Sequence, residues 1–285
     1  MRRWLAWLAA LALGGCAPAG EPAVRPALWR AVHGGSTIWL FGTIHLLPAD
    51  VKWNIGKVAQ AVAQADTLIT EIPEGDAQAQ AAAFLKVARA EGLPPIAERV
   101  APGERAALTA AIDVAGLPTS ALDRMTTWGA ALAIGAGAAR GAGATVQAAP
   151  EAVLARAFAG RRREALESFA GQLGIFAELA EADQRLLLSR TLTEARDARA
   201  SYARMLAAWS RGDAAAMQAT FNRAFAGAPE LAAALITRRN RAWADRLAAR
   251  GNGTALVAVG AGHMIGSAGL PALLSARGYR VARVQ

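Results

Sequence analysis

Two apolar runs, one near each end of the chain, share a pattern in which the run ends at a glycine. They cover residues 37–41 before Gly42 and residues 254–259 before Gly260. Short apolar runs of β-formers that end at glycine predict buried strands. In both cases a histidine stands three residues after the glycine. The pattern therefore places this histidine just beyond the end of each predicted strand.

The polar and apolar positions that follow His45 predict a strand–helix–strand unit. A hairpin is expected over 28–41, with His33 in its exposed turn, and a helix over 54–65 precedes a short strand that ends at Glu71. Strands joined by a helix run parallel with a right-handed crossover. Their C-terminal ends then share one edge of the sheet, where ligands of open α/β sheets bind. His45 and Glu71 are therefore expected to meet there.

The C-terminal segment repeats this order and sets the expected fold. A glycine-rich loop with His263 follows the strand over 254–259, and the helix over 270–276 leads to a last strand over 279–284. The predicted fold is α/β, in which two strand–helix–strand halves form a mixed, largely parallel sheet. The halves are 26–75 and 251–285, and a large, mainly helical insertion over 76–250 separates them; within it, 161–167 is either a short strand or a helix start.

The N-terminus has the features of a bacterial lipoprotein. Residues 1–15 contain a charged start, a short apolar core and small residues, as in a signal peptide. Leu13-Gly14-Gly15-Cys16 resembles a lipobox, in which Cys16 would be lipidated, and residues 16–25 would form a tether. We expect a protein anchored at the periplasmic face of the outer membrane; an ordinary cleaved signal with an incidental cysteine is the alternative. Because Cys16 is the only cysteine, a disulfide within the chain is excluded.

The composition narrows the classes of partner. The formal net charge is +9, but the sequence has no basic stripe with interleaved aromatic residues, so nucleic acid is not expected as a partner. Attraction to anionic lipid surfaces or acidic polymers fits the charge better. The run Arg161-Arg162-Arg163 is more typical of a solvated face than of a site.

The candidate chemistry rests on His45, His263 and Glu71. Two neutral imidazoles and a carboxylate leave coordination positions open on a divalent ion, where bound water can attack a carbonyl. Without a metal, the same residues could act as a general base with its orienting carboxylate. Gly42 and Gly260 are expected to let the backbone turn and a ligand approach closely. A pair of satisfied buried histidines is the alternative, and the sequence contains neither a Gly-x-Ser-x-Gly nor a His-Glu-x-x-His motif.

These motifs resemble those of the TraB/PrgY/GumN family, which includes the Tiki proteins. The resemblance covers residues 26–284. It is carried by Leu40-Phe41-Gly42-Thr43-Ile44-His45-Leu46, by Glu71 after its strand, by Gly260-Ala261-Gly262-His263, and more weakly by Arg239-Asn240 with Trp243 and by Leu166-Glu167 with Gln172.

The resemblance implies a fold akin to the erythromycin-esterase-like and haem-binding ChaN-like proteins. Tiki proteins are metal-dependent proteases that use both Gly-x-x-His histidines and a glutamate, with manganese or cobalt. Carried over, His45, Glu71 and His263 become metal ligands or catalytic residues. Glu167 becomes a second carboxylate, and Arg239 a site-supporting or oxyanion-binding cation.

The expected function is a lipid-anchored periplasmic metal-dependent hydrolase acting on a peptide or on a small amide or ester. Manganese or cobalt is the expected ion, with zinc as a further candidate. A different class stays open, namely a non-catalytic lipoprotein that binds haem, metal or a peptide signal. A structural envelope lipoprotein with a degenerate site is a third interpretation, against which the intact histidine pair argues.

Overall fold

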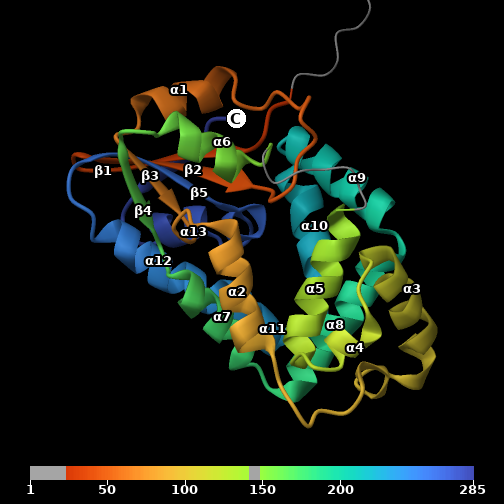
Figure 1. The fold of residues 1–285 in the computed structure, drawn as a ribbon. Coiled ribbons are helices and arrows are strands. Elements are labelled where there is room, and N and C mark those ends of the chain that lie inside the picture. The colour runs from red at the N-terminus through yellow and green to blue at the C-terminus, as the bar shows by residue number, and fades with distance from the viewer. Residues whose placement is uncertain (1–23, 141–147) are drawn as a thin grey trace, which may run out of the picture.

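The computed structural model of the chain describes residues 24–140 and 148–285. The predicted signal peptide and Cys16 lie outside these residues. The described residues form one six-stranded sheet with helices on both faces and a group of helices to one side (Figure 1). Within the described part of the chain, no helix is long and apolar enough to cross a membrane.

The sheet has the strand order β4-β3-β5-β2-β1-β6. Strand β5 pairs in parallel with β2 and β3, and β3 pairs in parallel with β4, whereas β1 runs antiparallel to β2 and β6. The predicted mixed, largely parallel α/β sheet is therefore confirmed. The strands are β1 (Leu28–His33), β2 (Ser36–Thr43), β3 (Thr67–Thr70), β4 (Arg162–Ala165), β5 (Gly253–Gly260) and β6 (Arg280–Arg283).

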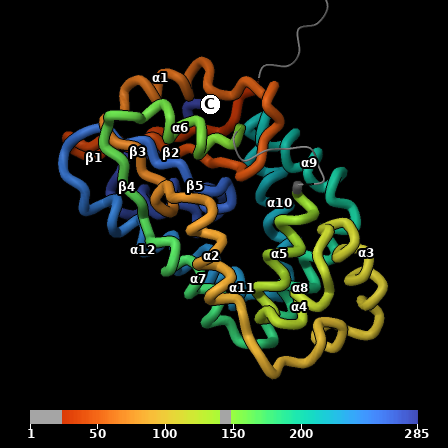
Figure 2. The backbone as a smooth tube through the Cα atoms, viewed as in Figure 1, coloured from red at the N-terminus to blue at the C-terminus, as the bar shows by residue number. Residues whose placement is uncertain are grey.

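Alternate side chains of β2 build two cores, because successive residues of a strand point to opposite faces. Trp39 and Phe41 pack with α1 (Gly56–Gln64) and α6 (Pro150–Ala157). Ile38 and Leu40 pack with α12 (Arg238–Ala248) and α13 (Leu270–Ser275). The tube in Figure 2 shows the chain's first and last coloured segments brought together in this sheet.

Helix α1 is shorter than the helix expected over 54–65, and its buried face differs from the expected one. The pattern placed Ile55, Val58, Ala59 and Val62 on the buried face, but Ile55 lies before the helix and is 42% exposed. Val58, Ala61 and Val62 are the buried residues.

Four of the helices between β3 and β5 form a separate group with its own core. This core joins residues of α3, α4, α5 and α8 (Figure 1). The close crossing of α3 and α5 uses Gly137, where a Cβ atom would lie 2.5 Å from the Cβ of Ala115. The helices are α2 (Ala77–Ala88), α3 (Arg105–Ala115), α4 (Thr119–Leu122), α5 (Thr127–Arg140), α7 (Phe169–Ala177), α8 (Glu181–Arg196), α9 (Ala198–Ser210), α10 (Ala214–Ala224) and α11 (Pro229–Ala232).

Helix α9 fixes the end of β2 from the helical side. The indole N–H of Trp209, which is buried, donates to the Gly42 carbonyl at 2.8 Å. The Tyr202 hydroxyl donates to the Leu46 carbonyl at 3.1 Å. These two bonds hold the segment that carries His45 against the helices.

Candidate functional site

The C-terminal ends of four parallel strands carry the predicted site residues. His45 follows β2, Glu71 follows β3 and Glu167 follows β4, and His263 lies in the 3₁₀ turn Ala261–Met264 directly after β5. Parallel pairing brings these four ends to one edge of the sheet. Strand β4 therefore resolves the choice that the sequence left open for 161–167, and it places Glu167 beside Glu71, whose carbonyl accepts from the Glu167 N–H at 2.8 Å.

Gly260 lies at the centre of the arrangement. A Cβ atom on this residue would lie 3.1 Å from Glu71 Oε1, 3.7 Å from His263 Cδ2 and 3.9 Å from His45 Nε2. The two histidines and the glutamate thus surround one point, although they are far apart in the sequence.

The two motif glycines serve close approach and not a sharp turn. Neither has a positive φ, and Gly260 has an ordinary φ of −48°. A Cβ atom on Gly42 would lie 3.0 Å from the Cα of Ala261, so the ends of β2 and β5 could not approach as they do with a larger residue. The chain turns directly after Gly260, but a backbone conformation reserved for glycine is not what makes this turn, and side chains of the protein lie beside both glycines.

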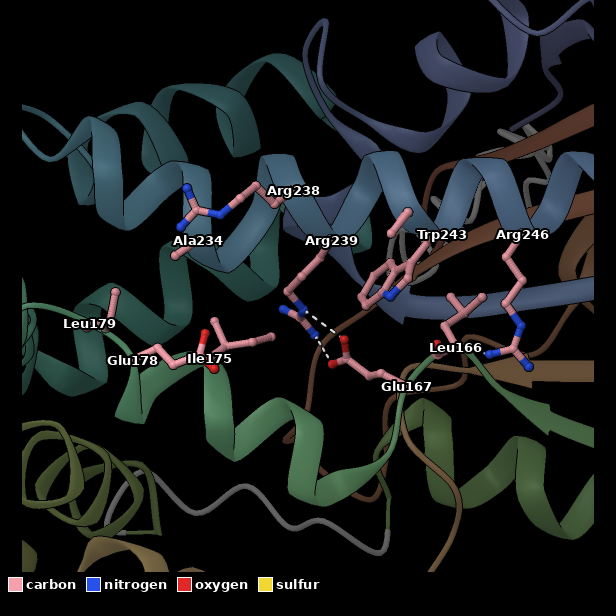
Figure 3. Close-up of a pocket in the computed structure, with 11 residues that line it drawn as sticks. Leu166, Glu167, Ile175, Glu178, Leu179, Ala234, Arg238, Arg239, Trp243 and Arg246 are labelled. Atoms are coloured by element: carbon pink, nitrogen blue, oxygen red, sulfur yellow. Dashed lines mark hydrogen bonds and ion pairs between the residues drawn. The ribbon is translucent and has the colours of Figure 1, made fainter.

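Three side chains form a buried charged network beside Gly260. Arg239 Nη2 donates to Glu71 Oε2 at 2.7 Å and to Glu167 Oε1 at 2.6 Å, and its Nε donates to Glu167 Oε2 at 3.2 Å. Figure 3 shows the Arg239–Glu167 pair between α12 and the segment after β4. Gln172 Nε2 bridges the two carboxylates at 3.0 and 3.1 Å. All three charged side chains are at most 14% exposed.

Arg239 supports the site and offers no free donor. Its Nη1 donates to the Leu235 carbonyl at 2.9 Å and contacts His263 Nε2 at 3.2 Å. These are the guanidinium N–H groups that do not bond to Glu71 or Glu167. The guanidinium also lies over the Trp243 ring, 4.6 Å from its centroid. Of the two roles that the resemblance implied for Arg239, this bonding fits the supporting one.

Glu71 is ionised at neutral pH. Burial acts to raise the pKa of its carboxyl. The positive charge that His263 takes up in acid, the Arg239 guanidinium and the Gly260 N–H together outweigh burial and lower it. The Gly260 N–H donates to Oε1 at 2.7 Å. Oε1 keeps a further lone pair on the side of the two histidines.

His263 is a buried, neutral imidazole in a fixed tautomer. Asn240 Nδ2 donates to the carbonyls of His263 and Ala268, so the amide oxygen faces His263 Nδ1 at 2.6 Å and accepts its proton. Nε2 therefore has the lone pair. Burial lowers the pKa of His263 to about 4, and the ring packs on Trp243 with centroids 4.5 Å apart.

His45 is bound in the opposite way, by a carboxylate. Its Nδ1 lies 3.0 Å from Glu151 Oε1, which also accepts from the Thr43 hydroxyl at 2.5 Å. The hydrogen bond to Glu151 raises the pKa of His45 to about 9. The side chain is 72% exposed, so solvent screening weakens this pair. His45 is therefore the member of the group that meets solvent, with Nε2 directed to the point beside Gly260.

The donor set does not fit a metal ion in this arrangement. The site expected from the sequence would hold its ion with three side-chain donors directed to one point, as catalytic zinc sites do. Among the residues that the structure describes, no group of three or more His, Cys, Asp and Glu side chains could hold an ion. Arg239 is bonded to both Glu71 and His263, and His45 is bonded to Glu151. Ligation of manganese, cobalt or zinc by His45, Glu71 and His263 stays a prediction.

The sequence model of the TraB/PrgY/gumN family matches residues 27–283. The chain belongs to the TraB/PrgY/gumN family. The family resemblance of the motifs is therefore confirmed over nearly the whole chain. Searches of curated proteins and of solved structures find no match to it.

In this member of the TraB/PrgY/gumN family, sequence reasoning missed Glu151 and the part that Asn240 takes in the site. Glu151 lies in the first turn of α6, outside every motif, and only the packing of α6 on the sheet brings it to His45. The sequence did point to Asn240, because Arg239-Asn240 is one of the motifs that resemble the family and lies on a predicted helix. His33 lies outside the site: it is exposed, as predicted, but it is the last residue of β1 and not part of the turn, and its Nδ1 contacts the Gly278 carbonyl at 3.0 Å.

Proposed function

We propose that this protein is a hydrolase that adds water to the carbonyl of an amide or ester, with a peptide or a small amide or ester as substrate. The observation that carries the proposal is the meeting of His45 Nε2, Glu71 Oε1 and His263 around Gly260. Groups that accept and donate protons at one solvent-open point are what acyl transfer to water requires.

We assign the roles of these groups from their hydrogen bonds. Glu71 Oε1, ionised and with a lone pair to spare, accepts the proton of the attacking water. His45, held by Glu151 and open to solvent, donates a proton to the leaving group. Two groups whose environments shift their pKa values in opposite directions form a natural acid–base pair. Arg239 and Asn240 hold Glu71 and His263 in these positions.

Replacing Glu71 and His45 tests these roles. A panel of N-acylated peptides and esters is incubated with the protein, and released products are measured by mass spectrometry. Glu71→Gln and His45→Ala should each lower turnover by about a hundredfold or more, the contribution typical of a general acid or base. His33→Ala is the matched control and should keep wild-type turnover. Unchanged turnover in Glu71→Gln would remove this residue from the mechanism.

The metal-dependent form of this proposal is tested in the same assay. The family resemblance supports a divalent ion, whereas the bonding of Arg239 opposes a three-donor site. Turnover that EDTA abolishes and manganese or cobalt restores would favour the metal-dependent hydrolase. Binding of haem or a peptide without turnover by any variant would favour the binding-protein alternative.

We also propose that the protein is a lipoprotein held at the periplasmic face of the outer membrane. The support is the sequence of residues 1–16, which ends in Leu13-Gly14-Gly15-Cys16. Cys16→Ser should release the protein from the membrane fraction of a bacterial host. Continued retention of Cys16→Ser in that fraction would contradict lipid anchoring.

A further inference from the structure

A groove of about 490 Å³ runs between α7 and α12 on the side of the charged network. Its apolar lining includes Leu166, Ile175 and Leu179, with Trp243 at its floor (Figure 3). An open groove of this size with apolar walls and a few charged groups suits one small organic ligand or a short stretch of peptide.

The groove has a distinct distribution of charge. Arg238 and Arg246 line it two helical turns apart on α12, and Glu178 lines it from the end of α7. Arg246 gives one N–H to the Leu166 carbonyl at 3.0 Å, and no carboxylate among the described residues pairs with it. The described pair of Arg238 is with the exposed Glu230, at 3.6 Å. At the end of the groove near Leu166, Arg246 is therefore the cation without a carboxylate partner among the described residues, because the adjacent Glu167 is bonded to Arg239. The other end holds both signs of charge.

We propose that this groove binds the apolar, carboxylate-bearing end of a short peptide. Arg246 would bind the terminal carboxylate, because a guanidinium fork matches a carboxylate. Leu166, Ile175 and Leu179 would contact apolar side chains of the peptide. Glu178, which would repel a polyanion, can instead accept from peptide N–H groups. This charge pattern favours a peptide terminus over a phosphate-rich ligand.

The groove adjoins the candidate site through two shared residues. Glu167 and Arg239 line the groove, and Arg239 also contacts Glu71 and His263. A peptide terminus in the groove would therefore lie beside the groups proposed to act on a carbonyl. The identification of this peptide as the substrate rests on the proposed hydrolase, whereas its binding does not.

Calorimetric titration with two matched ligands tests the groove. The probes are N-acetyl-Leu-Phe and its C-terminal amide, which differ in the carboxylate alone, and both are titrated into the full-length chain. The acid should bind about tenfold more tightly than the amide, as expected when a charged hydrogen bond worth about 1.4 kcal/mol is lost. Arg246→Ala should remove this difference. Arg241→Ala, at an exposed position of α12 outside the groove, is the matched control and should keep it.

A second variant tests whether the ligands bind in the groove, independently of the charge of Arg246. Ala242 lines the groove and is exposed, so Ala242→Trp should fill the groove and abolish binding of both ligands without disturbing the core. Circular dichroism checks the fold of each variant. Equal affinity for acid and amide, absence of binding by both, or a wild-type preference in Arg246→Ala would overturn the proposal.

Titration of His45→Ala distinguishes this proposal from the proposed function. Tight binding of the acid to His45→Ala, together with loss of turnover, would support both. If the wild-type protein hydrolyses no amide or ester of the panel but still prefers the acid, the hydrolase fails and the groove stands. Turnover without any preference for the acid would leave the hydrolase standing and reject the groove.

Discussion

Replacing Arg239 with methionine should destabilise the fold strongly at neutral pH and less so in mild acid. Methionine keeps the apolar contact with Trp243 but removes the charge that Glu71 and Glu167 share. Since the three charged side chains are at most 14% exposed, the variant leaves two buried carboxylates without their cation. Breaking a buried ion pair in this way costs about 3–5 kcal/mol. In a protein of this size that loss lowers Tm by about 6–20 °C.

The pH dependence follows from the sign of the shift at Glu71. In the wild-type protein its pKa is lowered, so its stabilising contribution is present at pH 7 and pH 5 and is lost as the pH falls through that lowered pKa. Without Arg239, burial would raise the pKa of Glu71, and the carboxylate can take up a proton near pH 5. The loss of unfolding free energy should therefore be smaller at pH 5 than at pH 7.

Urea unfolding of wild type and Arg239→Met at the two pH values measures this difference. Arg238→Met is the control, because Arg238 is exposed and its change should stay within about 0.5 kcal/mol. A loss below about 1 kcal/mol for Arg239→Met at pH 7, or a loss that does not shrink at pH 5, would contradict this role of Arg239.

Three further predictions concern the strand end that carries His45. Gly42→Ala should destabilise the protein by about 1–3 kcal/mol in urea unfolding, because the added Cβ would lie 3.0 Å from the Cα of Ala261; wild-type stability would contradict the close approach. Trp209→Phe should cost about 1–3 kcal/mol, since it leaves the Gly42 carbonyl buried without its donor, and a calorimetric Tm equal to wild type would oppose this. If His45 is the proton donor, turnover should fall as the pH rises through its pKa of about 9, because the donor is then deprotonated. Replacing Glu151 with glutamine should move this fall in turnover to lower pH. A pH profile that does not move would argue against the His45–Glu151 pair.

The sheet and the meeting of its strand ends followed from the order of the elements. Glu71 could be placed near His45 from sequence because strand–helix–strand units are parallel, and parallel strands end at one edge. The choice left open at 161–167 has a physical origin. Arg161-Arg162-Arg163 reads as a solvated face, and in the structure β4 is an edge strand whose arginines are largely exposed, so it shows no buried pattern.

The parts of the site that could not be predicted from the sequence depend on contacts between side chains that are far apart in the chain. Glu151 reaches His45 only because α6 packs on the sheet, and no spacing rule links positions 45 and 151. The exposure of Ile55 follows from the start of α1 at Gly56, two residues later than the start expected at residue 54. Arg239 bonds to four groups at once, and two of them, Glu71 and His263, are the predicted metal ligands. This bonding depends on side-chain geometry, which the composition and spacing of the sequence do not reveal.

Incorporation of ¹⁸O from labelled water tests directly whether the protein adds water to the carbonyl of an amide or ester. The protein is incubated in H₂¹⁸O with the panel of N-acylated peptides and esters, and the released carboxylates are examined by mass spectrometry. We expect one ¹⁸O atom in each new carboxylate with the wild-type protein and with His33→Ala, and loss of labelled product with Glu71→Gln. Labelled product formed equally by Glu71→Gln, or no labelled product from any member of the panel with the wild-type protein, would contradict the proposed hydrolysis.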